Sequence, residues 1–411
     1  MLHSLIRVVP RYLPVALLAA SLMSCHDDSG CYNCSYGPPG EFSAGVVSAD
    51  FNGDGFADVI ALSTVFPPSG QNPSNIKAYL STAAGAFGAP VYTADGFNPL
   101  YLATADLNGD GLLDLVSASF NDGALNILFN NKTSPGSFNP PLVLNSPGAS
   151  QVAIADMNGD GMLDLVSADF YVSLFLQTSP GTFAAPIGLY PGGANWVALG
   201  DLNGDGVPDV ALTDNVGVKV LMHTGAASSP TYAAPLSVFN QTLNYNVSGA
   251  NLIAIADVDG DGLNDLVITD PGPTGGMSPA VYVLLQNPAS HGTFLAPVGY
   301  PVATQDLAQS IVLSDLQGSG KLDIVIGGQS SVTVLLHDPS HAGQFLPATI
   351  YPANGANGIA VADINGDGKP DIVVSNGVTF PMMGGVVTTH PGVLLQSTTT
   401  PGTFQALQDL P

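Results

Sequence analysis

One nine-residue pattern of acidic and amide side chains, Asp-x-Asn/Asp-Gly-Asp-Gly-x-x-Asp, occurs seven times in this chain of 411 residues, once in degenerate form. Side-chain oxygens at positions one, three, five and nine, with a backbone carbonyl at position seven, can surround a cation that accepts about six to eight oxygens. Glycines at positions four and six permit the tight reversal of such a loop. The spacing therefore indicates binding of a hard divalent cation, Ca²⁺ above all. The copies occupy residues 50–58, 106–114, 156–164, 201–209, 257–265, 315–323 and 363–371.

The acidic residues are placed for coordination rather than spread for solubility. Of 32 acidic residues only Glu41 is a glutamate, and 21 of the aspartates lie within the seven patterns. The formal net charge is −25, with seven Lys and Arg in total. Nucleic acid and anionic membrane surfaces are poor partners for such a chain, because phosphate groups need clustered cations. The alternative to metal binding is that the Asp and Asn side chains only satisfy turn amides. We favour metal, because three carboxylates converging in one loop would otherwise repel one another.

The first residues have the pattern of an export signal. Arg7 and Arg11 precede an apolar stretch at 13–23 that is too short to span a bilayer. It ends in Leu-Met-Ser-Cys at 22–25, which resembles a bacterial lipobox and implies cleavage before Cys25 and acylation of its thiol. We predict a signal peptide at 1–24 and a lipid-anchored protein of the bacterial cell envelope, touching the membrane only through Cys25. An ordinary signal with a chance cysteine is the alternative.

Residues 25–43 are expected to form a flexible tether. Cys31 and Cys34 make a single C-x-x-C among Gly, Pro and Ser, with no second pair to complete a zinc site. A local disulfide in an oxidising compartment is the favoured state of these two cysteines.

Each acidic pattern lies between short apolar runs with the period of strands. One alternating run leads into the pattern (152–155), a second follows it (115–117), and a third comes later (281–285). A fourth run is predicted after a Gly-containing turn, as at 181–186, where the aromatic residue is Phe183. With 48 Gly, 33 Pro and no helical periodicity, four strands per unit predict an all-β fold: a seven-bladed β-propeller of four-stranded blades over 44–411. The residues equivalent to Phe183 are Phe87, Phe138, Tyr232, Phe294, Phe345 and Phe404.

The first unit begins near Gly45 and the last ends near Phe404, so no strand is left over to lock the ring by exchange. We therefore expect blade one to pack side by side against blade seven and this seam to be the weakest interface. An open or swapped assembly is the alternative.

The patterns are not EF-hands, because position twelve is never Glu and the flanking segments are strands. They resemble the FG-GAP or VCBS repeats of integrin α-chain propellers and their bacterial relatives. That resemblance implies a seven-bladed propeller with Ca²⁺ in hairpin loops between the first and second strands of certain blades. The ligands it implies are Asp50, Asn52, Asp54 and Asp58; Asp106, Asn108, Asp110 and Asp114; Asp156, Asn158, Asp160 and Asp164; Asp201, Asn203, Asp205 and Asp209; Asp257, Asp259, Asp261 and Asp265; and Asp363, Asn365, Asp367 and Asp371.

The remaining copy, residues 315–323, has Gln317 and Ser319 at two ligand positions and carries Lys321. We expect it to bind Ca²⁺ weakly or not at all.

No catalytic arrangement is recognisable, so we predict that the protein is not an enzyme. The seven histidines form no metal-spaced pair on a helix, and no Gly-x-Ser-x-Gly elbow or phosphate-binding loop is present. The favoured hypothesis is adhesion: an anchored, calcium-rigidified propeller that binds a protein or polysaccharide on the face away from the metal loops. A lectin or carbohydrate-acting enzyme and an envelope scaffold are the alternatives. Aromatic and Met residues that could bind sugar, or pack over the loop bases, are Phe66, Trp196, Tyr245, Phe380, Met382 and Met383.

Overall fold

The computed structural model describes most of the segment from Gly40 onward, which forms one compact unit. Within the described residues there is no helix, and none therefore that could cross a membrane. The predicted signal peptide, Cys25, Cys31, Cys34, Phe66, Tyr245, Phe380, Met382 and Met383 lie outside the described residues. The structure describes residues 41–42, 45–65, 74–96, 99–120, 122–214, 216–226, 228, 230–240, 252–270, 280–302, 308–328, 330–353, 355–375 and 390–410.

Seven antiparallel sheets follow one another along the chain, each built from four strands in sequence order, with an additional short strand, β1 (Glu41–Phe42), in the first. They are β2 (Val46–Ala49), β3 (Asp58–Val65), β4 (Ser74–Tyr79) and β7 (Val91–Gly96); β8 (Pro99–Ala105), β9 (Asp114–Ser119), β10 (Ala124–Leu128) and β11 (Leu142–Asn145); β12 (Gln151–Ala155), β13 (Asp164–Ala168), β14 (Val172–Phe175) and β17 (Ile187–Tyr190); β18 (Trp196–Gly200), β19 (Asp209–Asp214), β20 (Gly217–Leu221) and β23 (Leu236–Asn240); β24 (Ile253–Ala256), β25 (Asp265–Asp270), β26 (Ala280–Leu284) and β27 (Val298–Pro301); β28 (Ala308–Ser314), β29 (Asp323–Gly328), β30 (Ser331–Leu335) and β31 (Thr349–Pro352); and β32 (Ile359–Ala362), β33 (Asp371–Val374), β34 (Gly392–Leu394) and β35 (Gln408–Asp409).

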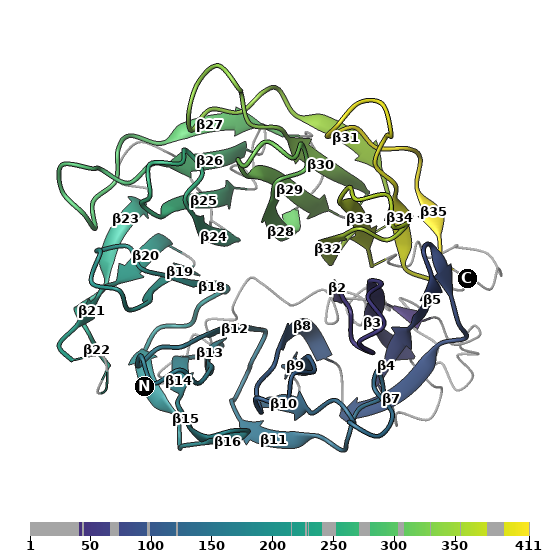
Figure 1. The fold of residues 1–411 in the computed structure, drawn as a ribbon. Coiled ribbons are helices and arrows are strands. Elements are labelled where there is room, and N and C mark those ends of the chain that lie inside the picture. The colour runs from purple at the N-terminus through teal and green to yellow at the C-terminus, as the bar shows by residue number, and fades with distance from the viewer. Residues whose placement is uncertain are drawn as a thin grey trace, which may run out of the picture. The chain divides into compact units, whose positions relative to one another are not determined.

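The first strand of each sheet lies innermost in a closed ring. Each of these strands contacts the first strand of the next sheet, in the order β2, β8, β12, β18, β24, β28 and β32, and β32 contacts β2 (Figure 1). The fold is a seven-bladed β-propeller of four-stranded blades, which confirms the fold class predicted from the sequence.

Burial follows the position of a strand within its blade. All six residues of β9 are buried, whereas the inner strand β12 is mostly half-buried and the outer strand β11 mostly exposed. Second and third strands are covered on both faces by neighbouring blades, so apolar residues predominate on both of their faces. The core is accordingly divided into seven clusters, one between each pair of adjacent blades.

The predicted position of the fourth strand was wrong. Phe183 lies in β16 (Thr182–Phe183), which pairs with β15 (Gln177–Ser179) in a small separate hairpin, and the fourth strand β17 begins only at Ile187. The hairpins β5 (Ser81–Ala83) with β6 (Ala86–Phe87) and β21 (His223–Thr224) with β22 (Thr231–Tyr232) are equivalent, and the other four blades have a single bridge there. Phe183 packs on the core cluster shared with the preceding blade. The alternating pattern of the run at 181–186 therefore arises from that contact, and the run is not a strand of the blade's four-stranded sheet.

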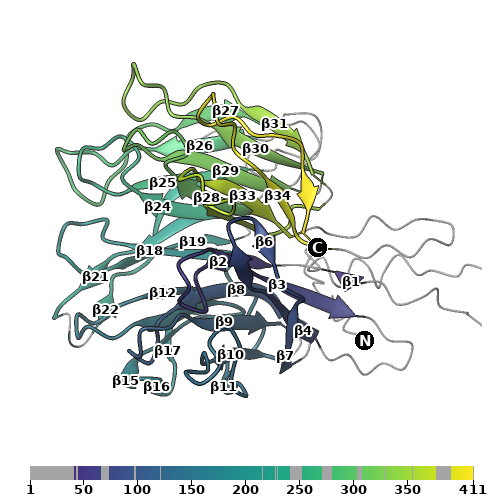
Figure 2. The same ribbon diagram turned by 45° about the vertical axis from the view of Figure 1, so that its right-hand side comes forward.

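Closure of the ring uses side-by-side packing, as expected. The cluster between blades seven and one joins Val46 and Tyr79 to Ile364, Val373 and Leu410. The short strand β1 (Glu41–Phe42), at the end of the predicted tether, pairs antiparallel with the last residues of β3 and so belongs to the sheet of the first blade. Figure 2 shows β1 and the hairpin β21–β22 on opposite sides of the propeller.

Candidate metal-binding hairpins

All seven acidic patterns form the connection between the first and second strands of a blade. In blade five, Asp257 follows β24 and Asp265 opens β25. The glycines at positions four and six have left-handed backbone conformations, with φ of 77° at Gly53 and 88° at Gly55 in the first blade. Side chains are disfavoured at such angles, which explains the two glycines. We call this side of the propeller the hairpin rim; the connections between second and third strands form the opposite side, the turn rim.

The aspartate at position one holds the reversal of each hairpin. In the first blade Asp50 Oδ1 accepts hydrogen bonds from the amides of Gly53 (2.7 Å) and Asp54 (3.1 Å), and Oδ2 accepts one from Gly55 (2.8 Å). In the degenerate hairpin Asp315 likewise accepts the amides of Ser319 and Gly320. This carboxylate therefore organises the loop even where two other ligand positions are missing.

The aspartate at position nine is fully buried and has a structural role of its own. Asp58 Oδ2 accepts the amide of Phe51 (2.9 Å) and Oδ1 accepts the amide of Ser81 (2.7 Å), just beyond the third strand. The same two bonds recur in all seven blades, including Asp323 with Leu316 (2.9 Å) and His337 (2.7 Å). Burial raises the pKa to about 6 for Asp58, Asp114, Asp164, Asp209 and Asp265, and raises that of Asp371.

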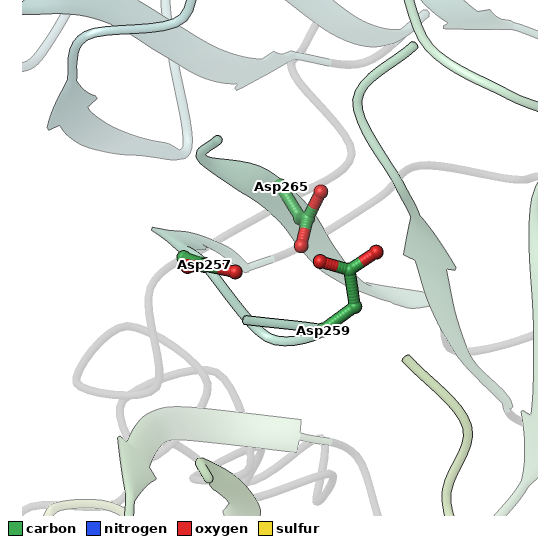
Figure 3. A group of neighbouring side chains, drawn as sticks. All are labelled: Asp257, Asp259 and Asp265. Carbon is green, nitrogen blue, oxygen red and sulfur yellow. The ribbon is translucent and has the colours of Figure 1, made fainter. Parts of the chain in front are cut away.

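Positions three and five lie at the tip of the hairpin, where position three is half-buried and position five is exposed in most copies. Asn52 Oδ1 accepts the amide of Asp54 (2.9 Å), and Asp54 Oδ1 accepts that of Phe56 (2.9 Å). In the fifth blade, carboxylate oxygens of Asp257, Asp259 and Asp265 lie within 4.8 Å of one another (Figure 3). An all-oxygen donor set of this charge fits a hard cation such as Ca²⁺.

Two lysines and a histidine from neighbouring segments approach some of these hairpins, which the pattern did not predict. Lys321 Nζ, from the degenerate hairpin, donates to the carbonyl oxygen of Asp259 in blade five (2.6 Å). Lys132 Nζ lies 3.9 Å from Asp110 Oδ2, and His223 Nδ1 lies 2.9 Å from Asp205 Oδ2. Part of the carboxylate repulsion is thus offset by the protein itself.

In the degenerate hairpin the substituted side chains bond within the hairpin and to the third strand. Gln317 Nε2 donates to Asp323 Oδ1 (2.9 Å) and lies 3.1 Å from His337 Nδ1, and Ser319 Oγ donates to Asp315 Oδ1 (3.2 Å). These contacts involve Asp315 and Asp323, at the positions one and nine that are predicted as ligands in the other six hairpins.

Position two of the pattern links each hairpin to the next blade, a role missed from the sequence. Its side chain is buried in the core cluster between its own blade and the following one, so Phe51 lies between blades one and two. The signal was present, because position two is always a sizeable apolar residue. The seven residues are Phe51, Leu107, Met157, Leu202, Val258, Leu316 and Ile364.

Backbone atoms of the hairpin are also bonded to the following blade. The carbonyl of Phe51 accepts Asn130 Nδ2 (2.8 Å), that of Leu316 accepts Gln396 Nε2 (2.9 Å), and that of Ile364 accepts the amide of Gly85 across the ring closure (2.8 Å). A change that orders or loosens a hairpin therefore acts on the interface between blades.

Of the aromatic residues considered as sugar contacts, only Trp196 is described. It is half-buried and packs edge to face on Tyr101, with ring centroids 5.2 Å apart, so the packing alternative holds for it. Among the described residues, Phe170 and Tyr171 form an exposed aromatic pair on the turn rim, which the sequence analysis did not consider. Their signal was a short Asp-Phe-Tyr turn between two strands that are wholly or mostly buried.

Comparisons with solved structures support the architecture. A lectin from Agrocybe aegerita, described with its recognition of non-reducing terminal N-acetylglucosamine, superposes with a TM-score of 0.51 at 20% identity, covering 75% of this chain and 80% of that one. BBS1N, crystallised in complex with ARL6DN, superposes with a TM-score of 0.50 at 10% identity, covering 83% and 91%. At these identities the likeness shows the fold alone. No curated protein matches the sequence significantly.

The fold and the hairpins define a closed β-propeller with an acidic loop on one rim of every blade. The family model for FG-GAP-like repeats matches residues 50–117, 106–167, 257–326 and 315–374, together more than half of the chain. The chain belongs to the FG-GAP-like repeat family. The fourth hairpin, 201–209, lies outside the matched residues, yet it has the same position-one and position-nine hydrogen bonds as the others.

Proposed function

We propose that this protein is a calcium-rigidified propeller, tethered to the bacterial cell envelope through a lipid on Cys25, that binds a protein or polymer partner on its turn rim. The observation that supports it best is the coupling of each acidic hairpin to the next blade through position two. It gives a bound ion a way to stabilise the whole ring.

Six hairpins supply the ligands, through their residues at positions one, three, five and nine. Bound Ca²⁺ would supply positive charge among carboxylates that otherwise repel. The chain does the rest: Asp50 pins the loop, Asp58 ties it to the second and third strands, and Phe51 anchors it between blades. In the degenerate hairpin the side chains of Gln317 and Ser319 take part in this internal bonding instead.

Thermal unfolding with and without a chelator tests the metal part of the proposal. A site held at about 100 times its Kd in free Ca²⁺ contributes about 2.7 kcal/mol, provided the unfolded chain does not bind. We expect EDTA to lower Tm and added Ca²⁺ to restore it, with Mg²⁺ as the control. An unchanged Tm in EDTA would contradict calcium binding.

Fractionation tests the envelope anchor. We expect the full chain to be found with membranes and to incorporate a labelled fatty acid, and we expect Cys25→Ser to lose both properties while keeping the same Tm. Equal membrane association of the two proteins would rule out a lipid at Cys25.

Carbohydrate binding is the second candidate, because the exposed rings of Phe170 and Tyr171 offer a stacking surface and a lectin shares the fold. A glycan array probed with and without Ca²⁺ separates the two candidates. Selective retention of a glycan would favour this one.

A further inference from the structure

The turn of blade three presents two aromatic side chains to solvent. Phe170 is 56% and Tyr171 is 55% exposed, between the buried strand β13 and the mostly buried β14. Large exposed apolar groups gathered on a short turn are typical of interaction sites. Val216, in the equivalent turn of the adjacent blade four, is also more than half exposed.

These rings are held in place rather than free to collapse. Phe170 packs edge to face on Phe120 of blade two, with centroids 5.7 Å apart and an interplanar angle of 69°. Its ring also lies directly over Gly148, where a Cβ would come within 2.8 Å of ring carbons. A glycine at this position leaves room for the ring to lie flat against the linker between blades two and three.

A buried carboxylate fixes the turn beneath the rings. Asp169 Oδ2 accepts hydrogen bonds from Ser146 Oγ (2.7 Å) and Ser167 Oγ (3.1 Å), and Oδ1 accepts the amide of Tyr171. Burying a charge is unfavourable unless such bonds compensate it. A rigid turn reduces the entropy lost when its exposed rings bind a partner.

The charge around these rings has one sign. Lys132, Lys321 and Lys369 belong to the hairpin rim, whereas Lys77 is buried and Lys219 is ion-paired with Asp214. No lysine or arginine among the described residues is thus exposed on the turn rim, where Asp122 lies exposed two residues from Phe120. With a net charge of −25, a second copy of this chain or an acidic polymer would be repelled.

We propose that Phe120, Phe170 and Tyr171, with Asp122, form a docking surface for a basic polypeptide segment whose Arg or Lys side chains lie against the two exposed rings. This deepens the proposed function by naming its partner class, and it rests on the turn rim being the binding face. The protein makes the same type of contact internally, since Lys219 Nζ lies 5.7 Å from the ring centroid of Tyr190.

Binding of a fluorescein-labelled deca-arginine peptide to the full chain tests this proposal, with fluorescence anisotropy as the measurement. Because a chain of this charge attracts any polycation, the decisive comparison is between variants of equal charge. The double variant Phe170→Ala/Tyr171→Ala should bind about tenfold more weakly, because both exposed ring–cation contacts are lost. The control is Tyr92→Ala, an aromatic residue of equal exposure (57%) on the outer strand of blade one, and it should bind as the unchanged protein does because its ring already contacts Lys77 Nζ, 5.6 Å from the centroid.

A second variant, Phe170→Leu/Tyr171→Leu, keeps apolar bulk without the rings and decides the question if the alanine variant does not fold. It too should bind more weakly.

Equal affinity of both double variants and the unchanged protein would overturn the proposal, because only nonspecific attraction would remain. Binding of uncharged chito-oligosaccharide that the double variants abolish, without any effect on the peptide, would overturn it in favour of a sugar site. If the double variants bind the peptide as tightly as the unchanged protein does while Tm still rises with Ca²⁺, the docking proposal fails and calcium binding stands.

Discussion

At the scale of single residues, the aspartates of one hairpin have different structural roles. The aspartate at position nine accepts two buried backbone amides in every blade, with or without a complete ligand set. Positions three and five, by contrast, lie at the tip, half-buried or exposed, and in the first blade the amides that they accept are exposed. The retention of Asp315 and Asp323 in the degenerate hairpin is therefore explained without any metal.

This division predicts two kinds of variant. Asp110→Asn, at position five, should remove much of the calcium-dependent rise in Tm contributed by its hairpin and have little effect in EDTA. Asp323→Asn should instead destabilise the protein equally in Ca²⁺ and in EDTA, by about 1–3 kcal/mol for the disturbed buried amides. Melting curves in both buffers make the comparison. A calcium-dependent loss in Asp323→Asn would show that the sixth hairpin binds metal after all.

Asp95 predicts a pH effect away from the hairpins. It is buried at the end of β7, and its carboxylate has at most a weak hydrogen bond, to the Ser117 hydroxyl. Burial raises the pKa of Asp95 to about 6; Ser117 offsets this only in part and the charge of Asp122 adds to it. A carboxyl whose pKa is higher in the folded protein contributes stability below about pH 4 that is lost as the pH rises through about 6.

Replacing Asp95 by Asn should therefore stabilise the protein at pH 7.5, by up to about 3 kcal/mol, and change it little near pH 4. Asp214→Asn is the matched control, because that buried carboxylate is paired with Lys219, which lowers its pKa despite burial, and it should destabilise by about 1–3 kcal/mol. Urea unfolding across this pH range measures both. A stability gain that does not depend on pH would contradict the assignment to Asp95 ionisation.

At the scale of elements, the hairpin is a connector between blades as well as a loop. Phe51 is fully buried between blades one and two, and it contacts Phe138 edge to face with centroids 6.2 Å apart. Phe51→Ala should cost about 3–5 kcal/mol, the usual range for a large core truncation. Phe56→Ala, in the same hairpin but exposed, should cost less than about 0.5 kcal/mol. Chemical denaturation measures both, and equal costs would mean that position two does not anchor the hairpin.

At the scale of the whole molecule, the core formed by the described residues consists of seven clusters, each between two neighbouring blades. Removing residues 355–411 would expose one face of blade six and one face of blade one. We expect the shortened chain to lose cooperative unfolding in calorimetry, because each blade buries its faces only against its neighbours. A sharp transition near the Tm of the full chain would contradict this view.

The sequence predicted the ring well because each blade repeats one acidic pattern between apolar runs, so one correct assignment applied seven times. It misplaced the fourth strand, since the alternation around Phe183 arises from packing on the neighbouring blade, a contact distant in sequence. It assigned Asp58 and its equivalents as ligands alone, because the amide of Ser81 reaches Asp58 only in the folded blade. The Phe170–Tyr171 surface was missed for the same reason: its supports, Ser146 and Phe120, belong to another blade.

The central claim is that the intact hairpins hold calcium, and an anomalous-scattering map from crystals grown with Ca²⁺ tests it most directly. We predict strong peaks within the hairpins at 50–58, 106–114, 156–164, 201–209, 257–265 and 363–371, and a weak peak or none at 315–323. Ordinary water density at all of the first six positions would contradict it.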